Sequence, residues 1–169
     1  FLGLDGGVTA ASPSALTLTA FKVPLVVSEP NTGDLLFGAT YTAATPTLTG
    51  GTGYPSQGIE LDLGNAVNYI PLLGGESVDI SQRQVTGKIL LDLTAAQEVT
   101  FMASVKANTL QSLGLMHGTT AGYKVMIFMP AAQLINPSKS EVNGKLMLGF
   151  DVRCVPTSAG NDELKIVVH

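Results

Sequence analysis

Apolar and polar residues alternate along much of this chain, which is the period of β-strands with one buried face. The clearest example is residues 145–154, KLMLGFDVRC, which follow the hairpin signal Asn143-Gly144. A second strand follows a turn at 164–168, and we expect both strands to supply core residues. The residues of the first strand that we expect to be buried are Leu146, Leu148, Phe150, Val152 and Cys154.

Similar segments recur at short intervals. The pattern predicts strands within 15–27, 35–41, 59–63, 66–73, 76–81, 85–93, 109–117 and 123–129. In the first, the parity of the apolar residues changes near Ala20, which predicts a bulge, and Pro24 favours an edge position or an interruption. Pro130 is expected to end the last of them, with a loop at 136–138. Residues 42–58 show no period and contain four Gly and two Pro, so we expect a long flexible loop there.

One segment favours a helix, at 94–107. Thr94 and Gln97 have the spacing of a capping box, and Val99, Met102 and Val105 recur at helical spacing. A strand over 99–105 remains an alternative, because the apolar residues there also alternate; the cap and the alanine content favour the helix. The sequence therefore predicts one mainly β domain over 1–169, an antiparallel β-sandwich or barrel with one flanking helix, preceded by an N-terminal arm at 1–14.

The composition of the chain favours another protein as its partner over nucleic acid. Hydrophobic residues make up 45% of the chain and charged residues only 13%, with no Trp. A neutral polar surface is easier to bury against another protein than a strongly hydrated one, which favours an assembling protein. The net charge is −4 and no Lys/Arg cluster occurs, which disfavours binding to nucleic acid phosphates.

The ends of the chain and its apolar runs bear on location. The sequence shows no apolar run near the roughly 20 residues that a membrane-spanning helix needs, and no signal-peptide pattern, so we expect a soluble, non-secreted protein without a membrane partner. Phe1 stands where an initiator Met would, which indicates a processed chain or a piece of a longer one. Cys154 is the only cysteine, which excludes an internal disulfide and favours a small core residue.

The sequence contains few residues or motifs that could carry out catalysis. His117 and His169 are the only histidines, and neither HExxH nor GxSxG occurs. The segment GGTGYPSQG lacks the Lys-Ser/Thr ending of a phosphate loop. Glu60 and Asp62 share a strand face, where two carboxylates more often form a solvated surface than a glycosidase pair. We expect His117 to hydrogen-bond a turn backbone, and we expect no enzyme, no cofactor, no metal and no catalytic residue.

Four segments together carry a resemblance: VTGKILLDLTAAQE, SLGLMHGTTAGYKVMIFMP, QLINPSKSEVNGKLMLGFDVR and PTSAGNDELKIVV. With a strand after an NG turn, a Pro-Gly loop and a closing GNDELxI strand, residues 85–168 resemble the tail tube proteins of long-tailed bacteriophages and prophages. The resemblance implies a structural virion protein, assembled in the host bacterial cytoplasm, whose copies form hexameric rings that stack into a hollow tail tube. It implies a tape measure protein and other tail proteins as partners, and DNA that passes through without specific binding.

Members of that family often have a long hairpin for stacking, for which 42–58 or the arm 1–14 are the candidates here. The charges that we expect to face the lumen or a neighbouring copy are Glu60, Asp62, Asp79, Lys145, Asp151, Arg153, Glu163 and Lys165. The alternative function is a non-catalytic binding module, an adhesin or a receptor- or carbohydrate-binding sandwich. Such a module would need a calcium site at loop tips or exposed aromatics, of which the tyrosines are Tyr41, Tyr54, Tyr69 and Tyr123.

Overall fold

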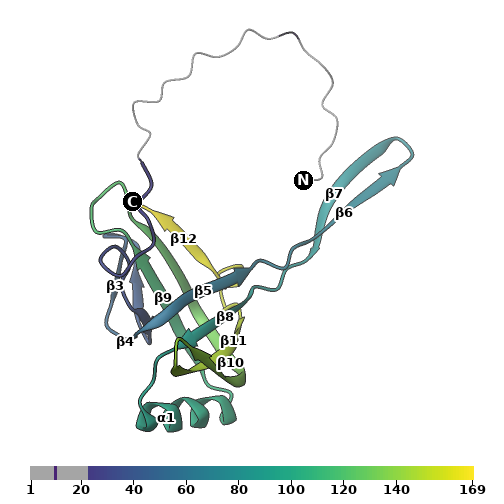
Figure 1. The fold of residues 1–169 in the computed structure, drawn as a ribbon. Helices are drawn as coiled ribbons and strands as arrows, with labels where there is room; N and C mark the ends of the chain where they lie inside the picture. The colour runs from purple at the N-terminus through teal and green to yellow at the C-terminus, as the bar shows by residue number, and fades with distance from the viewer. Residues whose placement is uncertain (1–9, 11–22) are drawn as a thin grey trace.

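The structure is a computed structural model that describes residue 10 and residues 23–169 (Figure 1). Its described residues form strands and one helix, α1, Ala95–Lys106. The strands are β1 Leu35–Phe37, β2 Thr40–Thr42, β3 Thr47–Thr49, β4 Thr52–Tyr54, β5 Ser56–Asp62, β6 Ala66–Leu72, β7 Gly75–Gln82, β8 Thr86–Leu91, β9 Leu110–His117, β10 Val125–Val142, β11 Lys145–Cys154 and β12 Lys165–Val168.

The main sheet is antiparallel and has the strand order β4-β1-β9-β10-β11-β8-β5, with β12 added to β10. Its two end strands, β4 and β5, are joined by Pro55 alone, so the sheet curls until both edges meet at that residue. The carbonyl of Pro55 accepts a hydrogen bond from the Asp92 N–H at 2.9 Å. The predicted mainly β fold, an antiparallel sandwich or barrel with one helix, is confirmed.

Strand β10 differs from the prediction. It does not end at Pro130, and residues 136–138 are not a loop, because the strand runs through both regions to Val142. The pairing register shifts between Met129 and Ala132 on the β9 side and again between Ile135 and Ser138 on the β11 side. Both prolines of the strand lie within these bulges, where the ladder does not need the N–H that proline lacks. The Asn143-Gly144 turn that follows is confirmed, with φ of 50° and 83°, as a type I′ turn requires.

Helix α1 is confirmed with its capping box. The Thr94 N–H donates to Gln97 Oε1 at 2.8 Å, and the Gln97 N–H donates to Thr94 Oγ1 at 3.4 Å. Of the three apolar residues at helical spacing, Val99 is 71% exposed, and the buried residue of the helix is Phe101. The helix lies at one end of the curled sheet (Figure 1), where Phe101 belongs to the core and the partly buried Val105 packs against it.

Strand β11 supplies much of the core, with one exception. Leu148, Phe150, Val152 and Cys154 are buried as predicted, but Leu146 is 60% exposed. The pairing of β11 with β8 begins at Leu148, so Leu146 lies beyond the part of β11 that β8 covers. The closing strand likewise contributes less than expected: β12 is an edge strand that pairs with β10, and it leaves Ile166 and Val168 exposed.

Two other predictions need correction. The loop expected at 42–58 contains β3, β4 and the start of β5, and the segment 35–41 divides into β1 and β2 at Gly38, whose φ is 78°. The chain turns tightly between β3 and β4, where a Cβ added to Gly51 would lie 2.8 Å from the Phe37 carbonyl oxygen. The sequence shows these glycines but not the close backbone approach that needs them. Of the strand expected at 15–27, the residues 23–27 are not in a strand, and 15–22, with the bulge at Ala20, lie outside the described residues.

Candidate functional site

A long hairpin projects from the body of the molecule (Figure 1). Within the described residues, strands β6 and β7 pair with each other alone, and they continue the ribbon that β5 and β8 form in the main sheet. The ribbon is interrupted at 63–65 and 83–85. At that point Gly64 has a φ of 58°, and a Cβ added to it would lie 2.3 Å from the Gln84 carbonyl oxygen. The hairpin is therefore a separate two-stranded element, and such hairpins are marginally stable alone in water.

One face of this hairpin is apolar. Residues directly opposite in an antiparallel pair share a face, so Val67 with Ile80 and Tyr69 with Val78 lie side by side. Val67, Tyr69 and Ile80 are exposed on this face. Leu72 lies on the opposite face with Ile70, and Leu73 in the turn is fully exposed. The hairpin therefore presents exposed apolar side chains of the kind that marks an interaction site.

The opposite face of the hairpin is polar near its base. Asn68 Nδ2 donates to Ser81 Oγ at 2.7 Å, and Ser77 Oγ donates to Asp79 Oδ2 at 3.3 Å. Asp79, one of the predicted charges, is therefore exposed on the hairpin and well separated in the sequence from the other predicted charges. The two faces together make the hairpin amphipathic, which suits an element that covers another protein surface with one side only.

An ion pair between the partly exposed Arg83 and the buried Glu163 lies at the base of the hairpin. Glu163, predicted to face a neighbour or a lumen, is instead only 7% exposed within its own chain. Arg83 Nε donates to its Oε1 at 2.8 Å, and Arg83 Nη2 lies 2.8 Å from its Oε2. A hydrogen bond from the backbone N–H of Glu163 itself, followed by the contacts with Arg83, holds the pKa of this carboxyl below its usual range. The pair joins the segment before β12 to the residue that directly follows β7.

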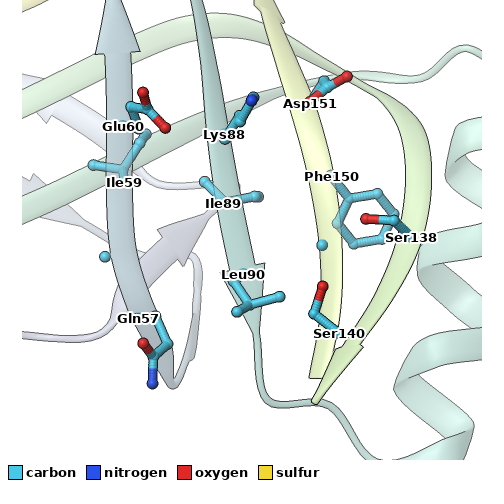
Figure 2. A pocket seen from close by; sticks show the side chains of 12 residues that line it. Gln57, Ile59, Glu60, Lys88, Ile89, Leu90, Ser138, Ser140, Phe150 and Asp151 are labelled. Carbon is cyan, nitrogen blue, oxygen red and sulfur yellow. The ribbon is translucent and has the colours of Figure 1, made fainter. Parts of the chain in front are cut away.

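Five of the predicted charges gather on one outer sheet surface, formed by β5, β8 and β11. The register places Glu60, Lys88 and Asp151 directly opposite one another in one row (Figure 2). Asp62, Thr86 and Arg153 form the next row. Further along β11, Lys145 forms an ion pair with Asp92.

Beside the row of Glu60, Lys88 and Asp151 is a hollow of about 390 Å³. It lies where Gly58 and Gly149 provide no side chains, and Gln57, Ser138 and Ser140 line it (Figure 2). Lys88 was missed by the sequence analysis, although its alternation with Ile89 on a predicted strand places it on the solvent face. Charges of alternating sign with amide and hydroxyl groups form a surface suited to polar contacts with a macromolecule.

The remaining predicted residues lie elsewhere. Lys165 has its Nζ 5.6 Å from the centre of the Tyr41 ring, which itself packs on Phe128. Tyr54 belongs to the core, where its ring centre is 5.0 Å from that of Phe101. Of the four tyrosines, Tyr69 on the hairpin is the one that the structure records as an exposed large apolar residue.

His117 has a structural role in the described part of the chain. Its Nδ1 lies 2.9 Å from Thr32 Oγ1, and its Nε2 lies 3.2 Å from the Leu25 carbonyl oxygen. One of its two partners is therefore a backbone carbonyl, and the imidazole fastens the segment before β1 to the end of β9.

Burial, with a smaller contribution from the charge of Glu163, raises the pKa of the Cys154 thiol to about 11, which keeps that thiol protonated and unreactive.

Within residue 10 and 23–169, the structure contains no group of three or more His, Cys, Asp or Glu side chains placed to hold a metal ion. Over the same residues, no helix has the length and apolar character to cross a membrane. No protein-family model matches the sequence, and no curated protein sequence matches it either.

Proposed function

We propose that this protein is a self-assembling structural protein of the phage tail tube type, whose copies associate into rings that stack into a hollow tube. The observation that carries the proposal is the projecting hairpin β6–β7 with its apolar face. An apolar ribbon that leaves its own body must be covered by another surface to be stable, and a second copy of the chain provides one in every solution of the protein.

A contact between the hairpin of one copy and a different surface of the next supports rings and tubes over a simple dimer. A hairpin that inserts into a different surface of the next copy makes a heterologous contact, which leaves each copy with one hairpin to donate and one surface to receive. Such contacts close into rings or continue into open filaments. Both outcomes are required of a protein whose rings stack into a tube.

The charge pattern is compatible with the same function. The outer surface of β5, β8 and β11 carries acidic and basic side chains together, so it does not form the basic stripe that would hold DNA phosphates. In this proposal DNA passes through the lumen without specific binding, and the tape measure and other tail proteins are the further partners. The assembled protein belongs to the virion.

Assembly is tested with purified full-length protein at increasing concentration, by size-exclusion chromatography with light scattering and by negative-stain electron microscopy. We expect rings or tubes from the wild type and monomers from the double variant Val67→Ser/Ile80→Ser, which changes a directly opposed pair on the apolar face. Val99→Ser is the matched control, since it replaces an exposed apolar residue on the helix and should assemble normally. A wild type that stays monomeric throughout, or a double variant that assembles as well as the wild type, refutes the proposal.

A further inference from the structure

The base of the hairpin β6–β7 is not tightly packed against the body. A cavity of about 230 Å³ lies there, bordered by Leu63 and Arg83 on the side of the hairpin and by Glu163, Leu164 and Ile166 on the side of the body. Close packing of side chains is what normally fixes the angle between two elements of a folded protein. Because this space is left open, packing alone does not fix the direction of the hairpin.

The ladder of strand pairs is interrupted at the same place. The pairing of β5 with β8 ends at Asp62 and Thr86, and the pairing of β6 with β7 begins at Ala66 and Gln82. The described ladder has no pair between these two, so a change of angle there breaks no hydrogen bond between strands. Gly64, whose φ is 58°, lies in the middle of the interruption and has the conformational freedom of a pivot.

Two segments of the body are anchored next to this pivot. Val85 is 1% exposed, and its carbonyl accepts a hydrogen bond from the Cys154 N–H at 3.0 Å. Leu164 packs against the core and leads directly into β12, which pairs with β10. Glu163, next to Leu164, is therefore held by the body, whereas Arg83, two residues before Val85, lies on the ribbon that leaves it.

The ion pair of Arg83 and Glu163 crosses from the ribbon to the body. Arg83 Nε donates to Glu163 Oε1 at 2.8 Å, and Arg83 Nη2 lies 2.8 Å from Glu163 Oε2. Two contacts between a planar guanidinium and a carboxylate fix their relative orientation as well as their separation. Three ion pairs occur among the described residues, and the other two join residues of the body to each other. The pair of Arg83 and Glu163 is thus the charged contact that ties the hairpin to the body.

We propose that Arg83 and Glu163 are positioning residues for assembly: their ion pair sets the direction in which the hairpin leaves the body and holds its apolar face in place for a neighbouring copy. Without the pair, the hairpin would swing about Gly64, and the neighbour would have to order it on binding, which costs conformational entropy. The effect on assembly rests on the self-assembly proposed above, whereas the effect on the direction of the hairpin is a property of the single chain.

Double electron–electron resonance measures the direction of the hairpin in the full chain. Nitroxide labels on Glu76→Cys, near the tip of the hairpin, and on Ala44→Cys, between β2 and β3, report the distance from the hairpin to the body; both positions are exposed. Labels on Ala44→Cys and Lys106→Cys, at the end of α1, report a distance within the body. Cys154 is buried and should stay unlabelled. An excess of unlabelled protein restricts the signal to distances within one chain.

The double variant Arg83→Leu/Glu163→Met removes both charges together, so it leaves no unpaired charge in the protein interior. The matched control is Lys139→Leu/Glu98→Met, which removes an ion pair between β10 and α1. We expect a narrow hairpin-to-body distance distribution in the wild type and the control, and a distribution several times broader in the double variant. The distance within the body should stay the same in all three. A double variant as narrow as the wild type, or a wild type that is already broad, overturns the proposal.

A conservative variant covers the case in which the double variant loses its fold, which a changed distance within the body would reveal. Arg83→Lys keeps the positive charge and removes the two-point contact, so it should also broaden the hairpin distance; a narrow distribution overturns the proposal.

The concentration at which assembly begins gives the second measurement, by size-exclusion chromatography with light scattering. The double variant should need a several-fold higher concentration than the wild type and the control. An unchanged concentration overturns the effect on assembly. A wild type that never assembles refutes the proposed function instead, and the distances within single chains still decide whether the ion pair sets the direction of the hairpin.

Discussion

The side chain of Phe101 should carry most of the attachment of α1 to the sheet. It is 6% exposed and is the one fully buried residue of the helix. Its ring centre lies 5.1 Å from that of Phe37, 5.0 Å from that of Tyr54 and 5.8 Å from that of Phe150, in one stacked and two edge-to-face contacts. Each contact joins the helix to a different strand or strand end.

Phe101→Ala removes all three ring contacts and leaves a cavity under the helix. Buried Phe→Ala substitutions cost about 3–5 kcal/mol, and aromatic pairs add about 0.5–1.5 kcal/mol each beyond their buried area. We expect a loss of about 4 kcal/mol in the free energy of unfolding, because the other helix residue that packs against the core, Val105, is only partly buried. Phe101→Leu should retain part of this stability, since it fills much of the volume but restores no ring contact.

Urea unfolding followed by circular dichroism, at a dilution where the protein is monomeric, measures the loss without a contribution from assembly. Val99→Ala is the control on the same helix, and its exposed side chain should change the free energy by no more than about 0.5 kcal/mol. A Phe101→Ala variant as stable as Val99→Ala would refute the view that one aromatic side chain attaches the helix.

Two further predictions concern the ribbon that leaves the body. Glu163→Gln should lower the free energy of unfolding by about 1.5 kcal/mol near pH 7, a value at the low end for charged hydrogen bonds because Arg83 is partly exposed. The folded state lowers the pKa of Glu163, so the stabilisation by its carboxylate is fully present above the ordinary pKa of 4.5 and is lost as the pH falls through the folded-state pKa. The stabilities of wild type and variant should therefore converge in acid unfolding titrations. A constant difference between them down to pH 2 would contradict this. Gly64→Ala should cost more than Gly144→Ala in urea unfolding, because both residues have positive φ, worth about 1–2 kcal/mol, but only the Cβ at position 64 would also meet a carbonyl oxygen, at 2.3 Å; equal losses would show that the backbone there yields freely.

The sequence predicted the fold where local signals and packing agree. The capping box of Thr94 and Gln97 and the Asn143-Gly144 turn depend on neighbouring residues alone, and both are present in the structure. The errors occur where distant strands decide the result. Pro130 remains inside a strand because β9 and β10 change register around it, and residues 42–58 become strands because β1 provides a partner for β4. Such partners lie 15 or more positions away, as Phe37 does from Thr52 and Met129 from Leu113, so the alternation within one segment does not reveal them.

The candidate site was likewise predicted correctly where it depends on local alternation and incompletely where it depends on distant strands. Strand alternation placed Glu60, Asp62 and Asp151 on a solvent face correctly, but it could not show that their strands are neighbours and that Lys88 lies between them. Glu163 was misplaced because its ion-pair partner, Arg83, is eighty residues earlier in the chain.

The hairpin was the more instructive case. Its apolar alternation matches that of a core strand, so the sequence predicts strands at 66–73 and 76–81 without showing that they project, and the candidates for a projecting element were 42–58 and 1–14. The break at Gly64, together with the matching lengths of the strands on either side of it, is the local sign that the ribbon leaves the sheet. When apolar alternation continues beyond a glycine with positive φ, such as Gly64, the second strand belongs to a core only if a further strand covers its apolar face. Among the residues that the structure describes, no third strand pairs with this hairpin, which is why its apolar face carries the proposal of a neighbouring copy as partner.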